Sequence, residues 1–203
     1  MGAANVASRW PELPKAQAPN VRVERVRAAS LRVFVSVTDS QARRWKDLGQ
    51  GLYLEHLDVV LEWRITHRQA RGKPGFEDRH PSADTLVWER VQCLGGLSCT
   101  LYARFLPSDD APQERTLRLL EFRVHSTQPT EHLFAGIKTH LERLLGAPSL
   151  EYDGTEGQLR SFAEWESERI LLLWKVVGGT RQGCVGEMWS KPLPKEYLKL
   201  TLA

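Results

Sequence analysis

Residues 130–145 read TEHLFAGIKTHLERLL, and this stretch carries the clearest secondary-structure signal in the chain. Its apolar side chains recur every three or four residues, the period that places them along one side of an α-helix. They are Leu133, Phe134, Ile137, Leu141, Leu144 and Leu145. Gly146 and Pro148 follow directly and are typical helix-terminating residues. Gly136 costs ~1 kcal/mol relative to Ala inside a helix, so we expect close packing to require it.

The segments on both sides of this helix alternate apolar and polar residues with a period of two, as half-buried β-strands do. The alternation covers residues 31–37, 59–66, 85–92, 97–106 and 116–125, then 165–177, 184–190 and the tail near 198–202. Short connections between successive strands favour antiparallel pairing. The sequence predicts an α+β fold with a largely antiparallel sheet of about seven or eight strands and a C-terminal β-hairpin. The helix over 130–145 is expected to cover one face of the sheet.

The length of 203 residues favours a single domain, and 41% hydrophobic residues with seven Trp are enough for a packed core. Residues 1–20 contain Pro11, Pro14 and Pro19 and read as an extended or disordered arm. Residues 21–203 are expected to form the single α+β domain.

Two of the three cysteines, Cys93 and Cys99, flank a Gly-Gly pair. A two-residue Gly-Gly turn would place Cys93 opposite Ser98, so that Cys93 and Cys99 point to opposite faces of the hairpin. We therefore expect these two and Cys184 to be free thiols, which favours a reducing compartment and a cytoplasmic location. The N-terminus shows no signal-peptide core, and no apolar run approaches the ~18 residues of a membrane span.

Charge is distributed unevenly, although the net value is only +3. The first fifty residues hold nine Lys or Arg against four Asp or Glu, concentrated in the region 22–46. Acidic residues dominate 151–168. The two regions either are solvated or face one another, or the basic one binds nucleic acid.

Sequence motifs of common catalytic sites are absent: the chain has no G-x-G-x-x-G, P-loop, H-E-x-x-H or G-x-S-x-G. We expect no cofactor and no metal site. The densest polar cluster lies in the loop 71–84, where Phe76, Asp78, Arg79 and His80 are the candidate binding residues. Such long loops are often functional, but a solvated loop is the simpler interpretation.

Tryptophans and arginines interleave along several predicted strands, for example Trp63 with Arg64. Neighbouring residues of a strand point to opposite faces, so we expect the indoles to pack inward and the guanidinium groups to lie outside. A base-stacking face is the alternative interpretation, and an arginine-rich outer face also suits a protein interface.

These observations favour a non-catalytic protein-interaction module, such as an adaptor, an inhibitor or immunity-type protein, or an assembly subunit. An enzyme with a site around the loop 71–84 is one alternative, and a nucleic-acid binder using the region 22–46 is another. The sequence names neither the partner nor the oligomeric state.

Overall fold

The computed structural model describes residues 39–77, 84–107, 113–153, 159–177 and 183–193. The chain divides into two compact units, Met1–Phe34 and Val35–Ala203, and all the described residues belong to the second unit. The predicted arm over 1–20, the predicted strand over 31–37 and the tail near 198–202 lie outside the described residues.

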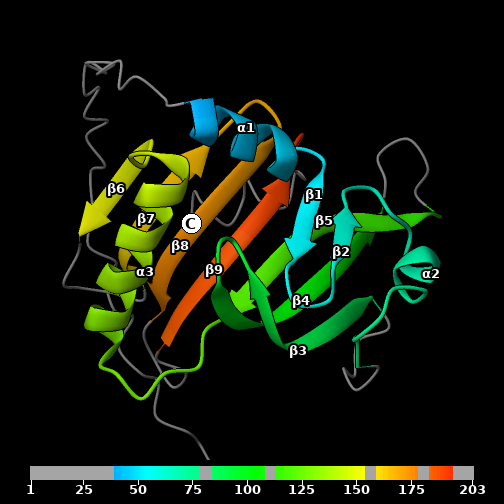
Figure 1. Cartoon of the computed structure of the whole chain (residues 1–203), viewed down its shortest axis with the longest axis horizontal. Coiled ribbons are helices and arrows are strands. Elements are labelled where there is room, and N and C mark those ends of the chain that lie inside the picture. Colours follow the sequence, from blue (N-terminus) through cyan, green and yellow to red (C-terminus); the bar gives the residue numbers. More distant parts are fainter. Residues whose placement is uncertain (1–38, 78–83, 108–112, 154–158, 178–182, 194–203) are drawn as a thin grey trace, which may run out of the picture. The chain divides into compact units, whose positions relative to one another are not determined.

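An antiparallel seven-stranded sheet dominates the described part of the chain (Figure 1). Its spatial order is β3, β4, β5, β9, β8, β7, β6, and each neighbouring pair is antiparallel. The strands are β3 (Thr85–Cys93), β4 (Leu97–Pro107), β5 (Arg115–Arg123), β6 (Leu150–Asp153), β7 (Leu159–Glu166), β8 (Ile170–Val177) and β9 (Gly183–Ser190). The α+β fold class with one main helix is confirmed.

Two helices and a small hairpin cover one face of this sheet. They are α3 (Thr130–Leu145), α1 (Asp39–Leu48) and the pair β1 (Gly51–Leu54) and β2 (Val59–Glu62). Helix α3 contacts β8, β9 and α1, and their buried side chains form one continuous core with those of the sheet. A single-turn helix, α2 (His67–Ala70), follows β2. No helix in the described segments is both long and apolar enough to span a membrane.

The predicted and observed bounds of α3 coincide. Gly146 ends the helix with a φ of 93°, and its N–H donates to the carbonyl of Glu142 at 2.9 Å. Leu141 is 1% exposed, as a central position of the apolar stripe requires. The expectation for Gly136 is wrong: a Cβ added there would meet no atom within 4 Å, so packing does not demand glycine.

Two predicted strands differ from the observed ones. The strand predicted over 59–66 ends at Glu62 as β2, and β2 forms a hairpin with β1 that has Asp58 at a φ of 52° in its turn. The segment predicted as one strand over 165–177 belongs to β7 and β8, which meet where the N–H of Ser167 donates to the carbonyl of Ile170 at 2.8 Å. Strand β6 and most of β7 occupy residues that lacked a clear strand pattern.

Most of the described strand tryptophans lie in the core, as expected. Trp88, Trp165 and Trp174 are each at most 1% exposed on the face covered by α3. The indole N–H of Trp88 donates to the carbonyl of Pro74 at 3.0 Å, and that of Trp165 donates to the carbonyl of Gly146 at 2.9 Å. These hydrogen bonds satisfy the one polar atom that each of these two rings carries into the core.

The hairpin of β3 and β4 differs from its prediction in one consequential way. Its turn uses three residues, 94–96, so Cys93 lies opposite Leu97 rather than Ser98. Cys99 is two residues beyond Leu97 on the same strand and therefore lies on the same face as Cys93. The carboxylate of Glu55 accepts hydrogen bonds from both glycine N–H groups of the turn and so stabilises the longer loop.

Candidate interaction surface

The described part of the predicted binding loop, residues 71–77, contacts the core at Phe76. Phe76 is half-buried against the core, with its ring centroid 6.1 Å from that of Trp88. The N–H of Glu77 donates to the carbonyl of Val87 at 2.7 Å and ties this part of the loop to β3. Phe76 is therefore partly a core residue, and its role in binding stays a prediction.

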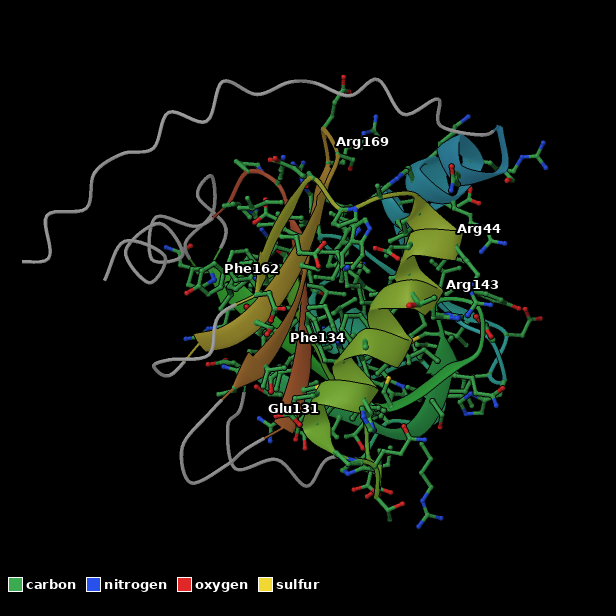
Figure 2. The ribbon with its side chains drawn as sticks, turned by 90° about the vertical axis from the view of Figure 1, so that its left-hand side faces the viewer. Arg44, Glu131, Phe134, Arg143, Phe162 and Arg169 are labelled. Carbon is green, nitrogen blue, oxygen red and sulfur yellow. The ribbon has the colours of Figure 1, made fainter. Side chains whose placement is uncertain are left out.

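The other three predicted site residues, Asp78, Arg79 and His80, lie outside the described residues, so their role in binding stays a prediction. Most of the basic region 22–46 also lies outside them. Its described part is in α1, where Arg43, Arg44 and Lys46 are exposed. Figure 2 shows Arg44 on this helix.

The sheet face opposite α3 carries ion pairs within and between its strands. Glu121 of β5 accepts from Arg104 of β4 at 2.7 Å and pairs with Arg123 at 2.6 Å. On β8 and β9, Lys175 pairs with Glu187 at 2.6 Å. The guanidinium groups of Arg104 and Arg123 lie away from the core, as predicted, whereas Arg118 of β5 is buried and donates to the carbonyl of Pro192. The pairing of Arg104 and Arg123 with Glu121, whose side chain is only 9% exposed, reduces the charge that they offer to a polyanion.

Strand β6 has a neighbouring strand on only one side among the described strands, because it ends the order of the sheet (Figure 1). Leu150 and Tyr152 of β6 are 52% and 48% exposed, the two highest values among the exposed large hydrophobic residues of the described chain. The ring of Tyr152 stacks on that of Phe162 in β7, with centroids 5.6 Å apart and planes inclined by 25°. Figure 2 shows Phe162 on the far side of the sheet from Phe134 of α3. We call Leu150, Tyr152 and Phe162 the β6 patch.

An acidic side chain adjoins the β6 patch. Glu164 lies opposite Leu150 in the register and two residues from Phe162 along β7, so all three side chains lie on the same face of the sheet. It forms no ion pair with any described residue. Burial raises the pKa of its carboxyl, the neighbouring Glu166 raises it further, and Lys191 opposes these effects. The Glu164 carboxylate is therefore less well solvated than a free one and would gain from a cation placed beside it.

The other acidic groups near β6 that the structure describes already have partners. Glu151 points to the α3 side of the sheet and pairs with Lys138 at 2.6 Å. Asp153 accepts a hydrogen bond from the hydroxyl of Ser161 at 2.9 Å. Glu166 pairs with Lys191. Among the described residues, Glu164 is thus the acidic group beside the β6 patch that is left to meet a partner's charge.

Hollows elsewhere in the described part of the chain are candidate small-molecule sites. One, of about 360 Å³, lies between the β3–β4 turn and α3 and includes His125 and His140 in its lining. Each imidazole already uses its Nε2 atom, His125 with the hydroxyl of Thr100 at 3.0 Å and His140 with the carbonyl of Leu94 at 2.7 Å. The other, of about 520 Å³, lies beside Trp63. No group of three or more potential metal-binding side chains occurs within the described ranges.

Sequence reasoning missed the β6 patch. The signals that were present are the acidic bias of 151–168 and the alternation of Leu150, Glu151 and Tyr152. Four residues are too few to distinguish a strand from a loop by periodicity. Exposure of the patch depends on the place of β6 at the end of the sheet, which only the tertiary structure decides.

Comparisons with known proteins leave the function open. No family model matches the sequence, and no curated protein matches it. A solved structure that is similar is that of a DUF4309 family protein, YjgB, from Bacillus subtilis subsp. subtilis str. 168. At 9% sequence identity the match covers 75% of this chain and 96% of that chain, with a TM-score of 0.42. At this level of similarity nothing about function is transferred to this chain.

Proposed function

We propose that this chain is a non-catalytic protein-interaction module that binds an extended, basic segment of a partner protein along β6. The observation that carries the proposal is the combination of an edge strand with exposed Leu150 and Tyr152. Edge strands of native proteins are commonly protected by charges, bulges or proline, because an unprotected edge pairs with other chains. Exposed apolar side chains on an edge therefore support a binding role.

The mode of binding follows from the backbone of β6. In an antiparallel pair, alternate residues direct their N–H and C=O groups toward the neighbouring strand, and the others direct them outward. An added partner strand would satisfy the outward groups of Leu150–Asp153, and its side chains would contact the β6 patch. Main-chain hydrogen bonds would supply affinity and the patch would supply selectivity.

The chemistry of the partner follows from Glu164. A Lys or Arg beside this carboxylate would form an ion pair in a partly desolvated setting, where it is worth more than on an open surface. The partner segment is therefore expected to alternate apolar residues with a basic residue on the side that faces Glu164.

A matched pair of variants tests the surface. Leu150→Lys places a charge in the β6 patch, and Val60→Lys places the same charge at a 39% exposed apolar position on β2. The wild-type chain and both variants serve as baits for quantitative affinity capture from a lysate of the source organism. We expect a partner that Leu150→Lys loses and Val60→Lys retains.

The captured partner then allows a direct affinity measurement. Tyr152→Ala should weaken binding about tenfold or more if this ring is an anchor of the interface. Glu164→Gln should weaken binding and also reduce its dependence on salt. Identical capture by all three baits would refute the proposal. If the wild-type chain self-associates in sedimentation experiments and Leu150→Lys abolishes this, a second copy of the chain binds at β6 instead.

A further inference from the structure

The three-residue turn between β3 and β4 brings Cys93 and Cys99 together. Their sulfur atoms are 3.8 Å apart, and the two side chains are 0% and 2% exposed. Both are free thiols. The pair lies in the core on the face covered by α3, in diagonal cross-strand positions.

Contacts from distant parts of the chain hold this turn in place. The carboxylate of Glu55 accepts from the N–H of Gly95 at 2.6 Å and from that of Gly96 at 3.2 Å. The Nε2 atom of His140 in α3 contacts the carbonyl of Leu94 at 2.7 Å. Glu55 and His140 therefore both hold the backbone of the turn, and this keeps the two sulfur atoms close together.

We propose that Cys93 and Cys99 form a modification site at which hydrogen peroxide produces an intrachain disulfide. The inference is independent of the proposed interaction at β6. The two sulfur atoms are 3.8 Å apart and must approach to about 2.0 Å to form the bond. Rotation of the two side chains, with small shifts of the turn, would bring them together. The second thiol is already in contact with the first, so it reacts before a second peroxide arrives.

The reaction balances without any further reactant. The thiolate of one cysteine attacks a peroxide oxygen and becomes a sulfenic acid, releasing one water after proton transfer. The second cysteine attacks that sulfur, the S–S bond forms, and the sulfenic hydroxyl leaves as a second water. Two thiols and one peroxide thus yield one disulfide and two waters.

The protonation state of Cys93 affects the rate at which it reacts. The hydrogen bond with Cys99 is the main cause that raises the pKa of the Cys93 thiol, followed by burial and the nearby Glu55 carboxylate. Because the thiolate is the reactive form, attack by Cys93 on peroxide should be slow at neutral pH and should accelerate as the pH rises.

Cys184 is an internal control in the same chain. It is buried, and its sulfur contacts the carbonyl of Thr130 at 3.3 Å rather than another sulfur. Burial, with a smaller effect of Glu131, raises the pKa of its thiol to about 11. Because its sulfur contacts a carbonyl oxygen rather than a second sulfur, Cys184 cannot form this disulfide and should still react with maleimide under conditions that oxidise the pair.

Peptide mapping provides the test. The folded full-length chain is treated with hydrogen peroxide, quenched, denatured with excess N-ethylmaleimide and digested with trypsin. The cleavage sites place Cys93 and Cys99 together in the peptide from Val91 to Arg104, with Cys184 in another peptide. We expect the first peptide to lose the mass of two hydrogen atoms and to carry no maleimide, while Cys184 carries one. Dithiothreitol should restore two maleimide sites to the first peptide.

Two single variants complete the test. After the same treatment, Cys99→Ala should leave Cys93 either as a maleimide adduct or as a sulfenic acid trapped by dimedone, and Cys93→Ala should give the mirror result. The wild-type map stands by itself if either variant fails to fold. Two maleimide adducts on the wild-type peptide at every peroxide dose, or disulfides only between chains, would overturn the proposal.

Discussion

Gly186 of β9 lies against the ring of Trp174 in the neighbouring strand β8, and replacing it by Ala should destabilise the protein. Phe122 of β5 and Trp174 of β8 are its cross-strand partners on either side, on the face covered by α3. A Cβ added at Gly186 would lie 2.7 and 2.8 Å from two atoms of the Trp174 ring and 3.2 Å from Phe122. Normal carbon–carbon contact begins near ~3.5 Å, so the ring must move by about 0.8 Å.

The magnitude follows from the environment of that ring. Trp174 is 1% exposed, so it can move only by displacing other core side chains. Overpacking of this kind typically costs ~1–3 kcal/mol, and we expect Gly186→Ala to lower the free energy of unfolding by about 2 kcal/mol. With a urea dependence of roughly 2 kcal/mol per molar, the unfolding midpoint should fall by about 1 M.

A double-mutant cycle assigns the cost to the contact. Trp174→Phe removes the ring atoms nearest to the added Cβ, so Gly186→Ala should cost at least ~1 kcal/mol less in that background. Urea unfolding followed by circular dichroism measures all four proteins. Gly136→Ala serves as the control, since the exposed helical site has open space and should gain ~0.5–1 kcal/mol. A cost of Gly186→Ala below 0.5 kcal/mol, or no coupling to Trp174, would refute this account of the packing.

Three further substitutions test other parts of the structure. Leu141→Ala should lower the free energy of unfolding by ~2–5 kcal/mol, because it leaves a cavity beneath α3. If urea unfolding shows only the small loss of stability that a surface substitution causes, the helix does not pack on the sheet as described. Phe76→Ala should lower the melting temperature measurably because the ring packs against Trp88, and an unchanged melting curve would show that the loop is not anchored there. The raised pKa of Glu164 means that the folded state binds its proton more tightly than the unfolded state, so this contribution to stability is present at low pH and is lost as pH rises through the folded pKa. Glu164→Gln should therefore make stability fall less between acidic and neutral pH than in the wild type, as measured by urea unfolding at each pH, and parallel profiles would contradict the raised pKa.

Local patterns were sufficient for some elements because their signals lie within the element. The apolar stripe of residues 130–145 and the glycine after it determine a helix with the observed bounds, since a helix forms its backbone hydrogen bonds within its own segment. The core positions of Trp88 and Trp174 likewise follow from strand alternation and hydrophobicity. The α+β class follows from the order of these elements.

The candidate surfaces depend on contacts between residues far apart in the sequence. Glu55 stabilises the turn of residues 94–96, and this single extra turn residue moves Cys93 onto the face of Cys99, which no local pattern indicates. The order of the strands places β6 at the end of the sheet and leaves Tyr152 exposed there. A two-residue periodicity shows which side chains share a face of a strand. Pairing between strands decides which face is covered and which strand lacks a neighbour, because its hydrogen bonds join segments that are far apart in the sequence.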